Sequence, residues 1–277
     1  MSTPSVRPTL SSMGWHDTAA LLLQIQRMVL LVGRPGIGKS AWAVEQARRW
    51  SGVEPEVLQG SPERDASALW GLFLLEGDRT RFVDGPLPRA LRSGAVLLVE
   101  EINLLPLEAR AELLALREAS VVTNPFTGER LPISERFRLL ATSNPESLQC
   151  DRMGDVAEAL IDGCLVLDVP DLNVVQVTDL LRQQHQSANE VHIDQVAKAW
   201  VAYQDLGDPM AKPPARLSYR AADQCLRLLM AGLELRQAVR VAMVNKYASH
   251  EKHYQTAQQM WRLGRGMGEE SDFVVDP

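Results

Sequence analysis

The sequence contains few cysteines and no long apolar run. Only three cysteines, Cys150, Cys164 and Cys225, occur among 277 residues. Their number and wide spacing argue against a disulfide framework and a metal-binding knuckle, and indicate a reducing compartment. No apolar run approaches the ~20 residues that a membrane-spanning helix needs, and the polar start MSTPSVRPTLSS lacks the hydrophobic region of a secretion signal. We therefore expect a cytoplasmic protein without membrane insertion.

Positive charge is also in short supply. The formal net charge is −6 and the pI is about 5.5, which argues against non-specific binding to nucleic acid. Apolar residues make up 45% of the chain and charged residues 23%, as is ordinary for a globular protein. The length is sufficient for one large domain and one small domain.

A glycine-rich stretch, GRPGIGKS, lies between an apolar run at 28–32 and a helical pattern over about 39–50. It fits the pattern G-x-x-x-x-G-K-[ST], in which backbone N–H groups turn inward around anionic oxygens at a helix N-terminus. The predicted nucleotide-binding residues are Gly33, Arg34, Pro35, Gly36, Ile37, Gly38, Lys39 and Ser40. Lys39 is expected to reach the β and γ phosphates, and the Ser40 hydroxyl a Mg²⁺ ion. The alternative is a chance turn before a helix.

Further polar groups follow two other predicted strands. Glu100 and Glu101 come directly after the apolar run 95–99, and Asn144 ends the predicted strand 136–145. Because the carboxyl ends of parallel strands share one sheet edge, these groups should meet the glycine-rich loop. Glu100 is assigned to the metal ion, Glu101 to polarising the attacking water, and Asn144 to holding that water or the γ phosphate. The alternatives are a solvated strand end and a plain Asn-Pro turn.

The order of elements predicts an α/β fold. Strands alternate with helices as far as Pro170, which implies a parallel sheet flanked by helices, and only helices are expected after it. Turn residues predict two β-hairpins, one turning at 76–79 and one spanning 121–134. The predicted regions are a flexible arm (1–15), a nucleotide-binding αβα domain with both hairpins (16–170), a helical lid (171–261) and a tail (262–277).

These residues resemble the MoxR-type AAA+ ATPases, the group that includes the rubisco-activating and nitric-oxide-reductase-activating accessory ATPases. GRPGIGKS is similar to the Walker A motif, VLLVEEIN to Walker B, and RFRLLATSNP to the sensor 1 strand with Asn144 as the sensor. SYRA is similar to the sensor 2 signature, with Arg220 as its arginine. The two hairpins lie where this family carries its insertions.

The resemblance implies a five-stranded AAA+ core, a helical lid and a ring, usually a hexamer, with ATP at the subunit interfaces. It also implies Mg²⁺-dependent hydrolysis that drives chaperone-like remodelling of a protein client through surface hairpins. A partner with a von Willebrand factor A domain often accompanies such proteins. The rival hypothesis is a nucleotide-gated assembly scaffold with weak or no hydrolysis.

The sequence departs from the family at two positions. Glu100 stands where the family generally has aspartate, and Gly163 stands where the resemblance places the arginine that acts on a neighbouring subunit. Either Arg152 replaces that arginine or hydrolysis is weak. Arg136 and Arg138 are further candidates. In the lid, Arg220 and Arg216 are both candidates for the γ phosphate, and the alternative for each is a solvated arginine.

Overall fold

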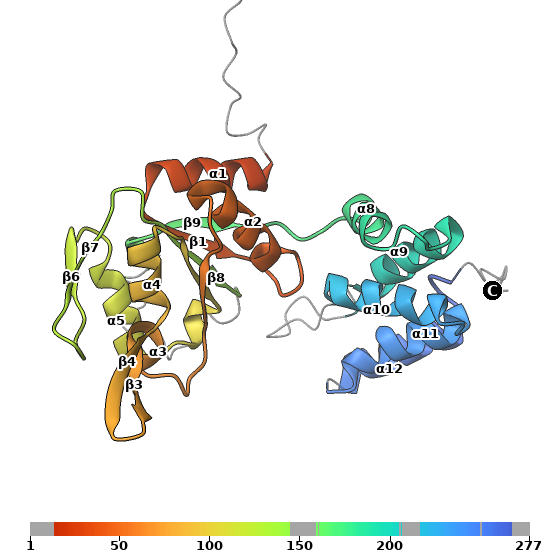
Figure 1. The fold of residues 1–277 in the computed structure, drawn as a ribbon. Helices are drawn as coiled ribbons and strands as arrows, with labels where there is room; N and C mark the ends of the chain where they lie inside the picture. The colour runs from red at the N-terminus through yellow and green to blue at the C-terminus, as the bar shows by residue number, and fades with distance from the viewer. Residues whose placement is uncertain are drawn as a thin grey trace, which may run out of the picture. The chain divides into compact units, whose positions relative to one another are not determined.

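The chain consists of two compact units, Met1–Pro170 and Asp171–Pro277. The computed structural model describes residues 14–144, 159, 161–204, 206, 217–249 and 251–267. Figure 1 shows the first unit in red to green and the second in green to blue. None of the described helices is both long and apolar enough to cross a membrane.

A five-stranded parallel sheet forms the centre of the first unit, with strand order β2-β5-β8-β1-β9. Its strands are β1 (Met28–Val32), β2 (Glu56–Gln59), β5 (Leu97–Glu100), β8 (Leu139–Ser143) and β9 (Leu165–Asp168). Every residue of β1 and β8 is buried. Such uniform burial is typical of parallel strands with both faces covered, and it explains why these strands are visible in the sequence as apolar runs.

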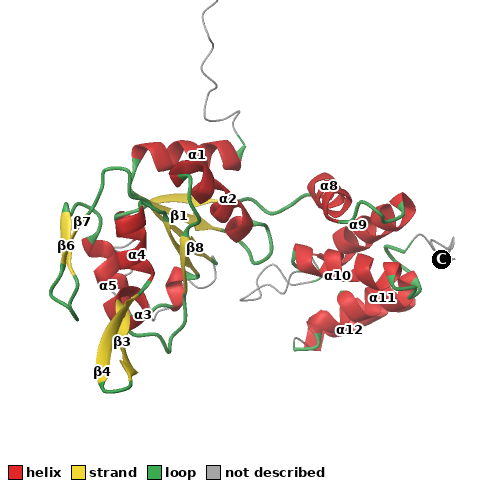
Figure 2. Ribbon diagram, viewed as in Figure 1, coloured by secondary structure: helices red, strands yellow, loops and turns green. Residues whose placement is uncertain are grey.

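Helices cover both faces of this sheet. They are α1 (Trp15–Ile25), α2 (Lys39–Ser51), α3 (Ser67–Trp70), α4 (Pro86–Ser93), the 3₁₀ helix η2 (Ile102–Leu104) and α5 (Leu107–Ala115). In Figure 2, α1 and α2 lie on one side of the sheet, and α4 and α5 on the other. Left-handed glycines, Gly38 and Gly52, flank α2, which fixes where this helix begins and ends.

Both predicted hairpins are present. The first pairs β3 (Gly71–Glu76) with β4 (Arg79–Asp84), and the second pairs β6 (Val121–Thr123) with β7 (Arg130–Pro132). The ring of Phe82 lies 5.0 Å from that of Phe73 on the same hairpin and 6.2 Å from that of Phe126 in the loop of the other. An aromatic cluster therefore joins the two hairpins.

In the second unit, the described residues form helices and the turns between them. Its helices are α8 (Val174–Gln184), α9 (Glu190–Gln204), α10 (Tyr219–Met230), α11 (Leu235–Ala242), the 3₁₀ helix η3 (Val244–Tyr247) and α12 (Glu251–Arg262). Its own core includes the fully buried side chains of Trp200, Tyr203 and Tyr247. The predicted fold, a parallel α/β core followed by helices, is confirmed.

Two helices end earlier than their sequence patterns predict. The pattern of residues 106–118 predicts a helix that reaches Glu118, but α5 ends at Ala115. The pattern of residues 235–246 predicts a single helix, but α11 ends at Ala242, and Met243 after it has a φ of −122°, outside the helical region. Met267, the last described residue, is buried against the helical core. The short helix α3 had no visible sequence signal.

Candidate nucleotide-binding site

The loop between β1 and α2 adopts a conformation that needs glycine. Gly36 and Gly38 have φ angles of 79° and 95°, in the left-handed region that side chains disfavour. At Gly33 a Cβ atom would lie 2.6 Å from Cδ1 of Ile37 and 2.9 Å from the carbonyl oxygen of Val169. The loop is therefore packed tightly against the residue that follows β9, with the N-terminus of α2 at its end.

Lys39 is held inside this loop and is only 6% exposed. Its ammonium group donates hydrogen bonds to the carbonyl oxygens of Gly33 and Arg34, the latter at 2.8 Å, and lies 3.4 Å from Oδ1 of Asn144. The loop is also bound to β8, since the Gly33 amide donates to the Ser143 carbonyl at 3.2 Å. Lys39, at the start of α2, therefore contacts Asn144, which directly follows β8.

Glu101 completes the network from a third strand. Its carboxylate accepts a hydrogen bond from Nδ2 of Asn144 at 2.9 Å, and its amide donates to Oγ1 of Thr142 at 3.2 Å. Glu101 has a φ of 50°, and within the described ranges it is the only non-glycine residue with a positive φ. Such strain persists where the surroundings fix it, frequently at functional sites. The structure thus brings together Lys39, Asn144 and Glu101.

Two supporting contacts were missed by sequence reasoning. Gly60, directly after β2, donates its amide to the Glu100 carbonyl at 2.7 Å, and a Cβ atom there would lie 2.1 Å from the Glu101 carbonyl oxygen. On the other side, the Ser143 hydroxyl donates to Oδ1 of Asn103 at 2.8 Å. A glycine at the end of an edge strand was the available signal for the first contact.

The proposed metal ligands lie at the same edge of the sheet. Glu100 is the last residue of β5, and Ser40 is the second residue of α2; both are partly buried. Carboxylate and hydroxyl oxygens are the donors that Mg²⁺ prefers, so the donor set fits this ion. Their roles stay predictions.

Two candidate arginines of the first unit, Arg136 and Arg138, are described, and they differ in their surroundings. Arg138 is buried, donates to the carbonyl oxygens of Leu23, Glu135 and Phe137, and lies 4.5 Å from the Trp50 ring centre. The hypothesis that Arg138 acts on a neighbouring subunit is therefore wrong, because its guanidinium is committed to backbone groups of its own chain.

The other candidates have different positions. Arg220 is exposed on the first turn of α10, in the second unit. Arg136, which is exposed, donates to the Trp50 carbonyl at 3.4 Å. Arg152 and Arg216 lie outside the described residues. Gly163 is buried, and a Cβ atom there would meet Cδ of Arg117 at 3.1 Å.

Comparison with known proteins shows what the part of the chain that contains these groups is similar to. Residues 28–162 match the AAA domain of the dynein-related subfamily. This part of the chain is similar to an AAA+ domain. This domain includes β1, β5 and β8, and with them the network of Lys39, Glu101 and Asn144.

Individual known proteins are also similar to this chain. The chain is 34% identical to NorQ of Paracoccus denitrificans over 128 residues, which cover 42% of this chain and 43% of NorQ. It is 27% identical to an uncharacterised Staphylococcus saprophyticus protein over 192 residues, or 66% of this chain and 70% of that one. The Hsp104 structure solved with ATPγS and casein shares the fold, with a TM-score of 0.53, 17% identity, and coverage of 78% of this chain and 41% of Hsp104. The predicted resemblance to MoxR-type AAA+ ATPases is confirmed, and it implies nucleotide binding and ATPase activity in general.

Proposed function

We propose that this protein is a Mg²⁺-dependent ATPase that assembles as a ring and remodels a protein client. The observation that carries the proposal is the network of Lys39, Asn144 and Glu101, which lie at the start of α2 and directly after β8 and β5. Three polar groups from distant parts of the sequence therefore lie together beside the glycine-rich loop. This arrangement suits a reaction that depends on positioning and electrostatic stabilisation.

ATP would be held by the glycine-rich loop. The left-handed backbone at Gly36 and Gly38 turns N–H groups inward, and the 13-residue helix α2 adds positive charge at its N-terminus. Lys39 would move its hydrogen bonds from loop carbonyls to the β and γ phosphates. Ser40 and Glu100 would hold Mg²⁺, which when bound neutralises charge on the phosphate oxygens.

Glu101 is the residue best placed to orient the attacking water. Its backbone is fixed in a strained conformation, and Asn144 anchors one of its two carboxylate oxygens. A carboxylate held in this way can accept a proton or a hydrogen bond from water. Asn144 therefore supports catalysis by fixing the carboxylate and by contacting Lys39 in the same network.

Replacement of Glu101 by Gln tests this assignment. The change keeps size and removes the negative charge, so ATP binding should persist while turnover falls by about 10²-fold or more, as for loss of a general base. Turnover is measured with purified protein in excess Mg²⁺-ATP, and binding by calorimetry. Glu108→Gln, on the exposed side of α5, is the matched control. Normal turnover in Glu101→Gln would show that this carboxylate does not activate water.

The hairpins supply a surface for the client. Leu72, Phe73 and Leu75 on β3 are 49%, 53% and 76% exposed, and the cluster of Phe73, Phe82 and Phe126 connects the two hairpins. Exposed apolar groups of this kind mark sites of protein contact. We infer that an unfolded or loosely packed client segment binds here, with a von Willebrand factor A domain protein as a candidate partner.

A second candidate function is a scaffold that ATP assembles without appreciable hydrolysis. Gly163 favours it, because the position where the family resemblance places the trans-acting arginine has no side chain and is buried. Turnover per subunit across a dilution series separates the two functions. A ring in which Arg152 or Arg220 completes a neighbour's site gains specific activity on assembly. A scaffold remains near zero at every concentration.

A further inference from the structure

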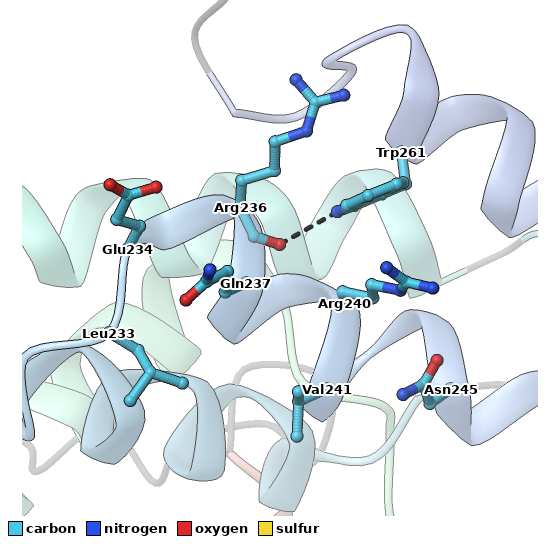
Figure 3. A pocket seen from close by; sticks show the side chains of 8 residues that line it. All are labelled: Leu233, Glu234, Arg236, Gln237, Arg240, Val241, Asn245 and Trp261. Atoms are coloured by element: carbon cyan, nitrogen blue, oxygen red, sulfur yellow. Dashed lines mark hydrogen bonds between the residues drawn. The ribbon is translucent and has the colours of Figure 1, made fainter.

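A groove on the helical unit gathers positive charge around one tryptophan (Figure 3). Its volume is about 610 Å³, and it is lined by Leu233, Glu234, Arg236, Gln237, Arg240, Val241, Asn245 and Trp261. The guanidinium carbons of Arg236 and Arg240 each lie 4.8 Å from the Trp261 ring centre. The indole N–H donates to the Arg236 carbonyl at 2.9 Å, which fixes the ring against α11.

The lining selects for a ligand that is both acidic and apolar. Guanidinium groups present paired donors that match carboxylates, and Arg236 and Arg240 are exposed. Arg240 has no ion-pair partner among the described residues. Val241, which is 51% exposed, and the face of Trp261 offer apolar contact beside these charges. Glu234 is the one carboxylate in the lining.

The chain itself passes this groove as it leaves α12. Arg236 donates to the carbonyl oxygen of Arg262 at 3.4 Å. Gly266 then packs closely on Ala202 and Tyr203. The positive charge of Arg236 partly offsets the rise that burial causes in the pKa of Tyr203. The last described residues are therefore held beside Arg236.

The sequence after Met267 has the matching chemistry. It reads GEESDFVVDP, with four carboxylates at 269, 270, 272 and 276 and three consecutive apolar residues at 273–275. Ten residues span up to ~33 Å when extended. This length is sufficient for the segment to reach the groove, because Arg236 in the groove lining already contacts Arg262.

We propose that the acidic segment 268–277 docks into the arginine groove of its own chain. Its carboxylates pair with Arg236 and Arg240, and its apolar residues cover Trp261 and Val241. The docked segment masks the basic surface, so an acidic partner binds there only by displacing it. This proposal does not depend on ATP hydrolysis.

The test uses a contact-quenched fluorophore on the full chain. A bimane label is attached to Pro277→Cys in a Cys150→Ser background; Cys164 and Cys225 remain, because they are buried and burial raises the pKa of each thiol to about 12. Docking places bimane near Trp261 and quenches it. Trp261→Phe, Arg240→Glu or added salt should each restore fluorescence several-fold. Lys252→Glu, an exposed charge reversal elsewhere on α12, should not.

Charge exchange separates docking from damage to the fold. If Arg240→Glu acts by losing a charge pair, adding Glu269→Arg and Glu270→Arg should restore quenching, with unchanged circular dichroism throughout. Fluorescence that is insensitive to both Trp261→Phe and Arg240→Glu would overturn the proposal. Quenching that weakens on dilution would overturn docking within one chain, because an intramolecular contact is independent of concentration.

Discussion

The phosphate-loop edge of the first unit and the arginine groove of the second present positive charge in opposite ways. Lys39 is 6% exposed and bound to backbone carbonyls of its own loop, whereas Arg236 and Arg240 are exposed and rest on a tryptophan ring. A buried, fixed cation loses little further freedom on binding and is poorly screened by salt. An exposed pair is adaptable and salt-sensitive. The first arrangement suits a defined small anion, and the second an irregular acidic chain.

Removing the fixed cation should have the largest effect. Lys39→Ala deletes charge-assisted hydrogen bonds to the phosphates, each worth roughly 1.5–3 kcal/mol, so ATP affinity should fall by about 100-fold or more. Calorimetric titration with ATP measures the change. Lys198→Ala is the matched control, since Lys198 is exposed on α9 and paired with Asp194 at 2.7 Å. Equal affinity in the two variants would mean that the buried lysine does not bind phosphate.

Backbone packing behind the site should produce the next largest effect. In Gly60→Ala the new Cβ atom would overlap the Glu101 carbonyl oxygen, which belongs to backbone and cannot rotate away. Overpacking of this kind costs about 1–3 kcal/mol, and the shift should also displace Glu101 and lower turnover. Urea unfolding and ATPase assays report both effects.

Gly163→Ala is the appropriate control for that variant. Its Cβ atom would lie 3.1 Å from Cδ of Arg117 and 3.2 Å from the carbonyl oxygen of Ala159, whereas the nearest atom at Gly60 is at 2.1 Å. A smaller loss of stability is therefore expected than for Gly60→Ala. Similar losses in the two variants would show that the close approach behind Glu101 has no special importance.

Some parts of the site could be predicted from the sequence, but the close contact at Gly60 could not. The positions of β1, β5 and β8 follow from apolar runs, and sheet connectivity then places Lys39, Glu101 and Asn144 at one edge. The left-handed backbone of Glu101 and the contact with Gly60 depend on how β2 pairs with β5, with Gln59 opposite Glu100. That register is set by contacts between residues distant in sequence, and no local pattern encodes it.

The arginine groove had still less sequence signal. Arg236, Arg240 and Trp261 come from two helices, α11 and α12, whose relative placement depends on the helical core. The amphipathic pattern of residues 235–246 predicts only that its arginines lie on a solvated or subunit-facing side. The break at Met243 was not predicted; this one residue separates the end of α11 from the start of η3.

The smallest predicted effect distinguishes the two units by pH. All four tyrosines of the sequence lie in the second unit, and burial raises the pKa of both Tyr203 and Tyr219 to about 12, from an ordinary value near 10. These groups stay protonated in the folded state while the unfolded chain ionises. Their contribution to stability is therefore complete below pH ~10 and is lost as the pH rises toward 12, by about 1 kcal/mol per tyrosine at pH 11.

Tyr203→Phe isolates one of these contributions. The Tyr203 hydroxyl is buried without a hydrogen-bond partner in the described structure, so its removal should change stability little at pH 7. At pH 11 the variant should lose about 1 kcal/mol less than the parent protein, because Phe has no proton to release from the unfolded state. Urea unfolding at the two pH values, followed by tyrosine absorbance, reports on the helical unit alone. An identical alkaline loss in both proteins would show that Tyr203 does not contribute to it.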